Sequence, residues 1–181
     1  MTPDELRALQ APLKTRYREE PSAAVVTLRA SGELGAENVT CKVTTGRALV
    51  EAGLHPATGG TGLSACSGDM LLEALVACAG VTLRAVATAL GIAIDGGTVT
   101  AEGDLDFRGT LGVAKDAPVG FRGIRLRFDL RTGAPPEQLA KLLELTERYC
   151  VVYQTLVKSP PVAISHRYNP PRAAPMTTDP R

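Results

Sequence analysis

The chain has four cysteines and two histidines as its candidates for nucleophilic, redox or metal chemistry. The cysteines are Cys41, Cys66, Cys78 and Cys150. No two of them form a C-x-x-C pair, and two histidines with scattered thiols are a poor supply for a closed zinc site. Structural disulfides are rare in cytosolic proteins, where cysteine pairs more often serve catalysis or metal binding. Redox chemistry and simple packing are therefore the two interpretations of these thiols, and no cofactor or metal is expected.

Cys78 lies in the middle of residues 67–91, where almost every side chain is apolar or small. Ser67 can cap the first N–H groups of a helix, Asp69 suits the positive end of its dipole, and Gly91 suits its C-terminal cap. A helix that is apolar nearly all round is buried on most sides. The alanines and glycine beside Cys78 leave room above its sulfur, which packing alone would not require. The stretch therefore predicts a central, buried helix that carries a working thiol.

Cys150 lies where one predicted helix gives way to another. A Pro-Pro pair opens the first helix, whose leucines form an apolar stripe, and residues 150–156 resemble a turn and a second short helix. Cys150 would then sit near a helix N-terminus, where the dipole lowers the pKa of a thiol. Cys41 falls on the apolar face of an alternating strand and Cys66 just before the central helix, so we favour packing for the first and a bystander role for the second.

The charged side chains that could alter the pKa of the Cys78 thiol lie in several separate segments of the chain. Glu73 and Arg84 are three helical turns apart and share one stripe of the predicted helix, about 140° from Cys78. They would reach the sulfur only from a partner subunit, or they form a structural ion pair in a dimer core. Arg47 and His55 could instead arrive from the strand and the glycine-rich loop before the helix, since histidine exchanges protons near neutral pH. A plain hydrogen-bonding role for His55 in its loop is the competing interpretation.

The elements that would position these residues fit one domain, because the chain has 181 residues. We expect a helical N-terminal arm over residues 1–21 and a disordered tail over residues 169–181. β-Forming and alternating residues predict strands at 23–31, 38–45, 48–52, 98–107, 121–131 and 162–166, with a turn at 31–35 and a loop at 109–120. In strand 121–131 arginines alternate with apolar residues, so we expect the arginines on a solvated face.

Composition excludes several classes of partner. The formal net charge is +1, tryptophan is absent, and no basic run is interleaved with aromatic residues, so nucleic-acid binding has little support. The central helix is long enough to cross a membrane, but Asp69, Glu73 and Arg84 would be costly there, and we expect no membrane span. Residues 1–10 lack a basic segment followed by an apolar one, so they do not form a secretory signal. The expected compartment is the cytoplasm.

Three segments together resemble the motifs of the OsmC/organic hydroperoxide resistance family. Its signature helix, a P-x-E-L-L opening followed by a central A-A-C, is similar to residues 67–84, which read S-G-D-M-L-L-E-A-L-V-A-C-A-G-V-T-L-R. Residues 54–60 resemble the Gly-Gly loop before that helix, and residues 147–152 resemble the second motif, usually Cys-Pro-Val. The resemblance covers about residues 22–168, the expected OsmC-like domain. It implies an α+β fold in which two buried central helices pack against antiparallel sheets in an intertwined homodimer.

The same resemblance implies a role for each thiol. Cys78 matches the thiol that attacks the peroxide, Cys150 matches the thiol that resolves the product, and Asp69 falls at the acidic position of the opening. The implied substrate is an organic hydroperoxide, and the implied partners are an external dithiol reductant and a second copy of the chain. The chain departs from the pattern at Gly68, where the hydroperoxide-specific branch has a glutamate, and at Val151, where proline is usual. It therefore resembles the broader OsmC-like branch.

Three hypotheses follow from the sequence. The first is a peroxidase that uses two thiols in defence against oxidative stress. The second is a binding protein that keeps the OsmC-like pocket for an apolar small molecule without turnover. The third is a structural dimer in which the cysteines only pack.

Overall fold

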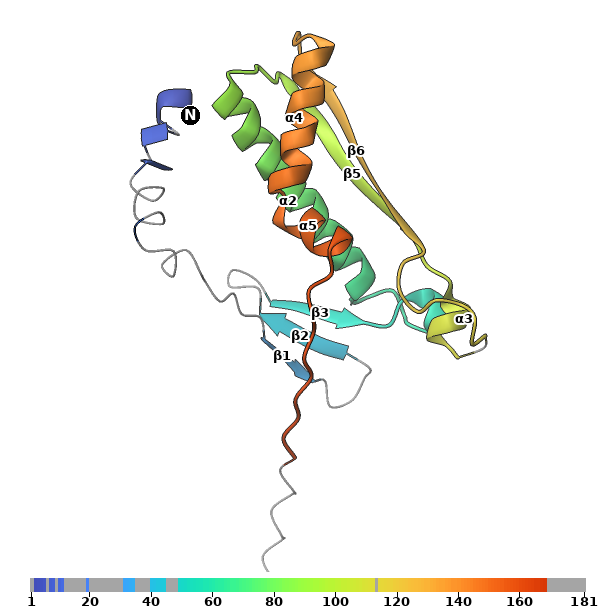
Figure 1. Ribbon diagram of the computed structural model, residues 1–181. Helices are drawn as coiled ribbons and strands as arrows, with labels where there is room; N and C mark the ends of the chain where they lie inside the picture. Colours follow the sequence, from blue (N-terminus) through green and yellow to red (C-terminus); the bar gives the residue numbers. More distant parts are fainter. Residues whose placement is uncertain are drawn as a thin grey trace, which may run out of the picture.

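A computed structural model of the chain describes residues 2–5, 7–8, 10–11, 19, 31–34, 40–44, 49–112 and 114–168, and for residues 31–34, 40–44 and 49 it describes the backbone. The elements in chain order are β1 (Ser31–Leu34), β2 (Thr40–Thr44), β3 (Leu49–Gly53), η2 (Pro56–Thr58), β4 (Ala65–Cys66), α2 (Ser67–Leu90), β5 (Gly96–Asp104), α3 (Phe107–Thr110), β6 (Gly123–Arg131), α4 (Pro136–Tyr149) and α5 (Val151–Val157). Figure 1 shows α2 in the middle of the molecule, with the α4–α5 pair crossing in front of it and the long β5–β6 hairpin alongside, and α2 contacts α4, α5 and β5. The predicted mixture of helices and antiparallel sheets is confirmed.

The central helix α2 has nearly the predicted bounds. Gly91 ends it with φ 69°, a left-handed conformation that glycine adopts at little cost, and the next N–H, from Ile92, donates to the Ala87 carbonyl oxygen at 2.9 Å. The prediction for its start is wrong in detail. The N-cap is Cys66, whose side chain makes no capping bond, and Ser67 is already helical.

Burial of α2 is one-sided in the single chain. A stripe of residues three or four positions apart is buried, namely Leu75, Ala79, Leu83 and Ala87. The opposite face remains open, and Val81 on that face is 72% exposed. The expectation that the helix is buried on most sides therefore does not hold within one chain, because α4, α5 and β5 cover only part of its circumference. The helix is also long and apolar enough to pass the length and composition test for a membrane span, but its buried stripe has a structural use inside the fold.

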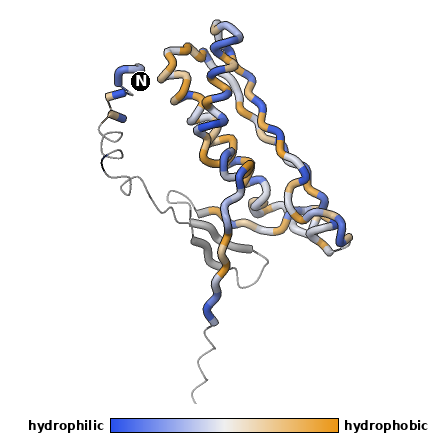
Figure 2. The backbone as a smooth tube through the Cα atoms, in the orientation of Figure 1, coloured by the Kyte–Doolittle hydropathy of each residue, from blue (hydrophilic) through white to orange (hydrophobic). Residues whose placement is uncertain are grey.

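Two sheets flank the helices. The strands of the first are ordered β1-β2-β3-β4, antiparallel except for the parallel pair β3–β4. The second is the antiparallel hairpin β5–β6, in which Val99 lies opposite Phe128. Along β6 half-buried and exposed residues alternate, as predicted, and Arg125 on the exposed face forms ion pairs with Glu102 and Asp104. Figure 2 shows apolar residues concentrated along α2 and alternating with polar ones along the hairpin.

The best-buried cluster lies where the C-terminal half of α2 meets α4 and β6. Its buried members are Leu83, Ala87, Ile92 and Leu142. Side chains from β6 and α4, including Phe128 and Leu139, pack around them. This cluster fixes α4 against α2, and the end of α4 then delivers Cys150 to the same helix that carries Cys78.

Two predicted segments have a different structure. Residues 31–34 form strand β1, paired with β2 so that Gly32 lies opposite Val43, rather than a turn. Residues 162–166 form no strand: they pair with none of the described strands, and Val162 and Ile164 are 85% and 93% exposed. The predicted strand at 23–31 lies outside the described residues apart from its last position, and the predicted tail at 169–181 lies wholly outside them.

Candidate functional site

Cys150 occupies the corner between two helices. It is at once the C-cap of α4 and the N-cap of α5, with extended backbone angles of φ −73° and ψ 108° that interrupt the helix. Its N–H donates to the Thr146 carbonyl oxygen at 2.9 Å, and its own carbonyl oxygen accepts from the Gln154 N–H at 2.9 Å. The predicted position beside a helix N-terminus is therefore correct.

The corner brings Cys150 against Cys78 in the middle of α2. The two thiols lie close enough that each alters the ionisation of the other. Cys78 is half-buried, whereas Cys150 is only 1% exposed. Of the two sulfurs, Cys78 is therefore the one that a small reactant can approach from outside.

The surroundings of Cys78 favour its thiolate. Burial raises the pKa of the Cys78 thiol, but four hydrogen bonds more than offset this, so the pKa lies below its ordinary value. The bonds come from the Val152 backbone, the Cys150 thiol, the Val151 backbone and the Thr82 hydroxyl. Backbone N–H groups and hydroxyls that point at a sulfur stabilise its negative charge. Cys78 is thus a nucleophile without a cation among the described groups that lower its pKa.

Cys150 has the opposite shift. Burial raises the pKa of the Cys150 thiol, and although the Tyr153 backbone lowers it, the hydrogen bond and negative charge of Cys78 raise it further. The predicted effect of the helix N-terminus is present, because the Tyr153 and Val152 backbone groups of α5 lower the Cys150 pKa, but burial and the neighbouring Cys78 outweigh it and the net shift is upward. Cys150 therefore favours its protonated form beside Cys78.

The other two cysteines are elsewhere. Cys66 is half-buried at the start of α2, where its sulfur lies close to Gly68 and on the same side as Phe121 and Leu105. The backbone of Cys41 lies in β2, paired with Leu34 on one side and Ala52 on the other.

The predicted supporting residues do not gather around Cys78. His55 caps the short helix η2, where its Nδ1 accepts from the Ala57 N–H at 3.0 Å, and its ring stacks on Phe107 at 4.8 Å. These contacts favour the competing interpretation, a hydrogen-bonding role in the loop. Arg47 lies outside the described residues.

Asp69 and Glu73 lie on the outer side of α2. Both line a shallow depression of about 510 Å³ between this helix and the Val99–Ala101 part of β5. Within the described part of the chain no ion pair joins Glu73 to Arg84, whose Nη1 donates to the Ile94 carbonyl oxygen at 2.8 Å. The site that the structure assembles therefore consists of Cys78, Cys150 and uncharged donors. Among the described residues no group of three His, Cys, Asp or Glu side chains could hold a metal ion.

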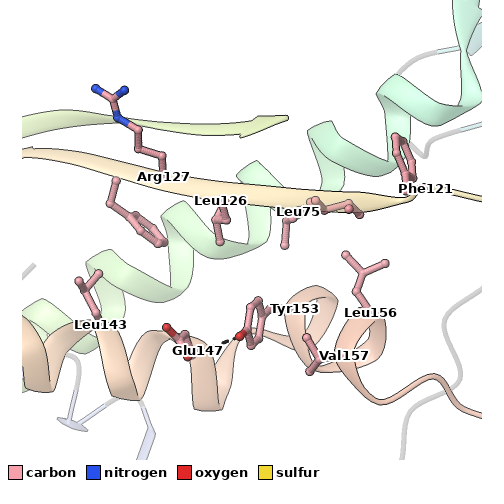
Figure 3. Close-up of a pocket in the computed structure, with 12 residues that line it drawn as sticks. Leu75, Phe121, Leu126, Arg127, Leu143, Glu147, Tyr153, Leu156 and Val157 are labelled. Atoms are coloured by element: carbon pink, nitrogen blue, oxygen red, sulfur yellow. Dashed lines mark hydrogen bonds between the residues drawn. The ribbon is translucent and has the colours of Figure 1, made fainter. Parts of the chain in front are cut away.

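A larger apolar cavity is lined in part by the helical turns that precede the two thiols. It has a volume of about 710 Å³ and lies between β6, α2 and the α4–α5 pair (Figure 3). Leu75, one turn before Cys78, and Glu147, one turn before Cys150, both line it. Figure 3 shows Leu126 and Leu156 directed into the space from opposite sides, and Glu147 linked to Tyr153 at its wall.

Several of these residues escaped the sequence analysis. Thr82 is four positions after Cys78, a helical spacing that could have revealed it. The sequence could not reveal the Val151 and Val152 donors, because they are backbone N–H groups, which every residue type except proline has. The apolar face of β6 and the leucine stripe of α4 were both predicted, but not that a cavity separates them.

Comparison with known proteins gives one family and one fold. A family model described as OsmC-like protein matches residues 60–165 of the chain. The solved structure of an OsmC-like protein from Mycoplasma pneumoniae is similar with a TM-score of 0.62 at 16% identity, covering 74% of this chain and 89% of that one. No curated protein sequence matches significantly.

Two further structures belong to proteins described as organic hydroperoxide resistance proteins. The one from Elizabethkingia anophelis has a TM-score of 0.59 at 20% identity, covering 75% of this chain and 91% of that one. The one from Legionella pneumophila, also described as a predicted redox protein, has a TM-score of 0.57 at 20% identity, covering 74% and 90%. At these identities the likeness establishes the fold.

Proposed function

This chain belongs to the OsmC-like protein family, and from that membership together with its paired thiols we propose that it is a thiol-dependent peroxidase that reduces organic hydroperoxides. The observation that carries the proposal is the asymmetric pair, in which an accessible Cys78 favours its thiolate and a buried Cys150 stays protonated beside it. The names of the organic hydroperoxide resistance proteins that share the fold support this substrate class.

In the first step the Cys78 thiolate attacks the terminal oxygen of ROOH. An S–O bond forms while the O–O bond breaks, and Cys78 becomes a sulfenic acid. The leaving alkoxide takes up one proton and departs as ROH. The half-buried Cys78 and its hydrogen-bond donors suit this step, because the thiolate rather than the thiol is the nucleophile.

The second step joins the two sulfurs. Once Cys78 is a neutral sulfenic acid, its negative charge no longer adds to the effect of burial in raising the Cys150 pKa, and Cys150 loses its proton more readily. Its sulfur then attacks that of Cys78, the S–S bond forms and hydroxide leaves, which takes up the proton to give water. An external dithiol reduces the disulfide by two electrons and restores both thiols. The resolving thiol is thus activated by oxidation of its partner.

The cavity of Figure 3 suits the organic part of the substrate. Leucine and phenylalanine side chains form half of its walls, and two of its lining residues, Leu75 and Glu147, lie one helical turn before Cys78 and Cys150. An apolar R group that enters it would bring the peroxide oxygens toward Cys78.

Two further expectations belong to this proposal. The open apolar face of α2, with Leu71 and Val81 exposed, supports a homodimer, and light scattering should give twice the 19.0 kDa mass of the chain. A monomeric mass at micromolar concentration would contradict it.

We also propose a cytoplasmic location, to be tested by cell fractionation.

Three single variants test the peroxidase proposal. Cys78→Ser should reduce consumption of cumene hydroperoxide to the rate of the reductant alone, because serine offers no thiolate. Cys150→Ser, without reductant, should consume one equivalent and form no intramolecular disulfide. Cys66→Ser is the matched control and should turn over like the unmodified protein. Turnover by Cys78→Ser equal to that of the unmodified protein would rule the proposal out.

The cavity also favours a second candidate, a binding protein for an apolar small molecule. That candidate predicts no rate above that of a free thiol and a lipid-like species in native mass spectra of the purified protein. Empty protein that reduces hydroperoxide would exclude it.

A further inference from the structure

The corner between α4 and α5 contains a hydrogen-bonded bridge that the thiol chemistry does not itself use. Gln154 donates from its side-chain Nε2 to the Glu147 carbonyl oxygen at 2.8 Å. Its main-chain N–H donates to the Cys150 carbonyl oxygen at 2.9 Å. One residue of α5 therefore binds both the last turn of α4 and the residue that links the two helices.

The bridge satisfies a group that the helix leaves unpaired. Glu147 lies in the last turn of α4, where carbonyl oxygens have no partner within the helix. Cys150 is extended, so the regular helical ladder does not continue through the corner. Besides the bridge, the Cys150 N–H to Thr146 carbonyl bond and a long contact of 3.5 Å between the Tyr153 hydroxyl and Glu147 span this corner.

We propose that Gln154 is a positioning residue for Cys78: by tying α5 to the last turn of α4, it holds the main-chain N–H groups of Val151 and Val152 against the Cys78 sulfur. The consequence for turnover rests on the proposed function, whereas the ionisation of Cys78 can be measured without it. Loss of the bridge would let the first turn of α5 shift away from α2 while leaving both cysteines in the chain.

The groups around Cys78 make these N–H donors important. Cys150 is the titratable group in contact with its sulfur. Glu147 and Tyr153 occupy the same corner but bond to one another at the cavity wall (Figure 3), and on α2 the Arg84 guanidinium is engaged with Ile94. On the hairpin, Glu102 and Asp104 pair with Arg125. With no cation among the described groups that stabilise the thiolate, the backbone donors must offset its burial.

The test is Gln154→Met, which keeps the length and helix propensity of the side chain and removes the donor. The rate of Cys78 alkylation by iodoacetamide is followed by mass spectrometry as a function of pH in the full chain. We expect the apparent pKa of Cys78 to rise by about one unit, so that alkylation below that pKa is about tenfold slower. At alkaline pH, where both proteins are fully ionised, the rates should be equal. A merely structural role for Gln154 would not produce this pH-dependent difference.

The matched control is Gln138→Met, the same substitution at an exposed position in the first turn of α4. It should leave the titration unchanged. Gln154→Ala is a second variant that removes the donor without adding an apolar group, so either folded variant decides the question. An unchanged pKa in the folded Gln154 variants, or an equal shift in Gln138→Met, would overturn the proposal. A shifted pKa in a protein that does not reduce hydroperoxides would leave it standing and refute the peroxidase function alone.

Discussion

Cys78 and Cys150 have the same side chain but opposite pKa shifts, because the helix corner gives them different neighbours. Val151 and Val152 on α5 hydrogen-bond to the Cys78 sulfur, whereas Cys150 is held beside the charge that Cys78 carries. Both sulfurs are partly desolvated, so burial alone would raise both pKa values. The difference comes from which sulfur receives the additional donors, and it supports the proposed roles of attack for Cys78 and resolution for Cys150.

The contribution of one donor can be isolated at Val151. Val151→Pro removes the N–H, and proline is tolerated in the first turn of a helix. Because fewer donors then stabilise the anion, the pKa of Cys78 should rise, and alkylation near neutral pH should slow about tenfold, with no difference at alkaline pH. Val151→Ala removes most of the side chain but keeps the N–H, so its titration should match the unmodified protein. Equal curves for the proline and alanine variants would contradict the prediction.

Among the helices and strands, the local sequence pattern predicted the position of an element well when that pattern, rather than pairing with a distant segment, determines the element. The apolar composition of residues 67–90 and the glycine at Gly91 predicted α2 and its end, and the alternation of apolar and charged residues predicted β6. Residues 162–166, which were also predicted as a strand, form none, since a strand exists only with a neighbour. The same reason explains β1, whose Gly-containing sequence predicted a turn and whose pairing with β2 makes it a strand.

The sequence predicted part of the candidate site, namely its two thiols, but not the groups that surround them. The two thiols were predicted from their places in the expected helices and from the resemblance to the family motifs, and the corner at Cys150 was predicted from the end of the leucine stripe of the preceding helix. Which sulfur the N–H groups of α5 would point at depends on how α5 packs against α2, which no local pattern encodes. His55 has a side chain suited to proton transfer, but its actual partners, Ala57 and Phe107, follow from the fold of its loop.

The elements around the cavity should set substrate size. Leu126 of β6 points into the cavity, so Leu126→Trp should fill part of it (Figure 3). We expect kcat/KM for cumene hydroperoxide to fall about tenfold, the scale of discrimination that apolar pockets achieve. Hydrogen peroxide, which has no organic group, serves as the internal control and should react at an unchanged rate. An equal loss for both substrates would show that the cavity does not hold the organic group.

For the whole molecule, the main consequence of the architecture is that the reactive pair joins distant parts of the chain. Cys78 is held by α2, and Cys150 by a corner that depends on the packing of α4 against α2. The core cluster around Leu83 and Leu142 is therefore also what aligns the two sulfurs. Damage to that cluster should lower stability and disulfide formation together, whereas changes on the solvated arginine face of β6 should affect neither.

Because the two cysteines are far apart in the sequence, a disulfide between them should change the thermal stability of the protein. A bond between them would close a loop of roughly seventy residues and restrict the unfolded chain, which stabilises the fold by about 4 kcal/mol. Protein kept under air with hydroperoxide should therefore melt at a higher temperature than the same protein kept with reductant, and Cys150→Ser should abolish the difference. If calorimetry finds identical melting in both states, the covalent link either does not form or strains the helices by as much as it stabilises them. When the expected difference is found, the melting temperature of a sample reports whether its two thiols are joined, without any assay of turnover.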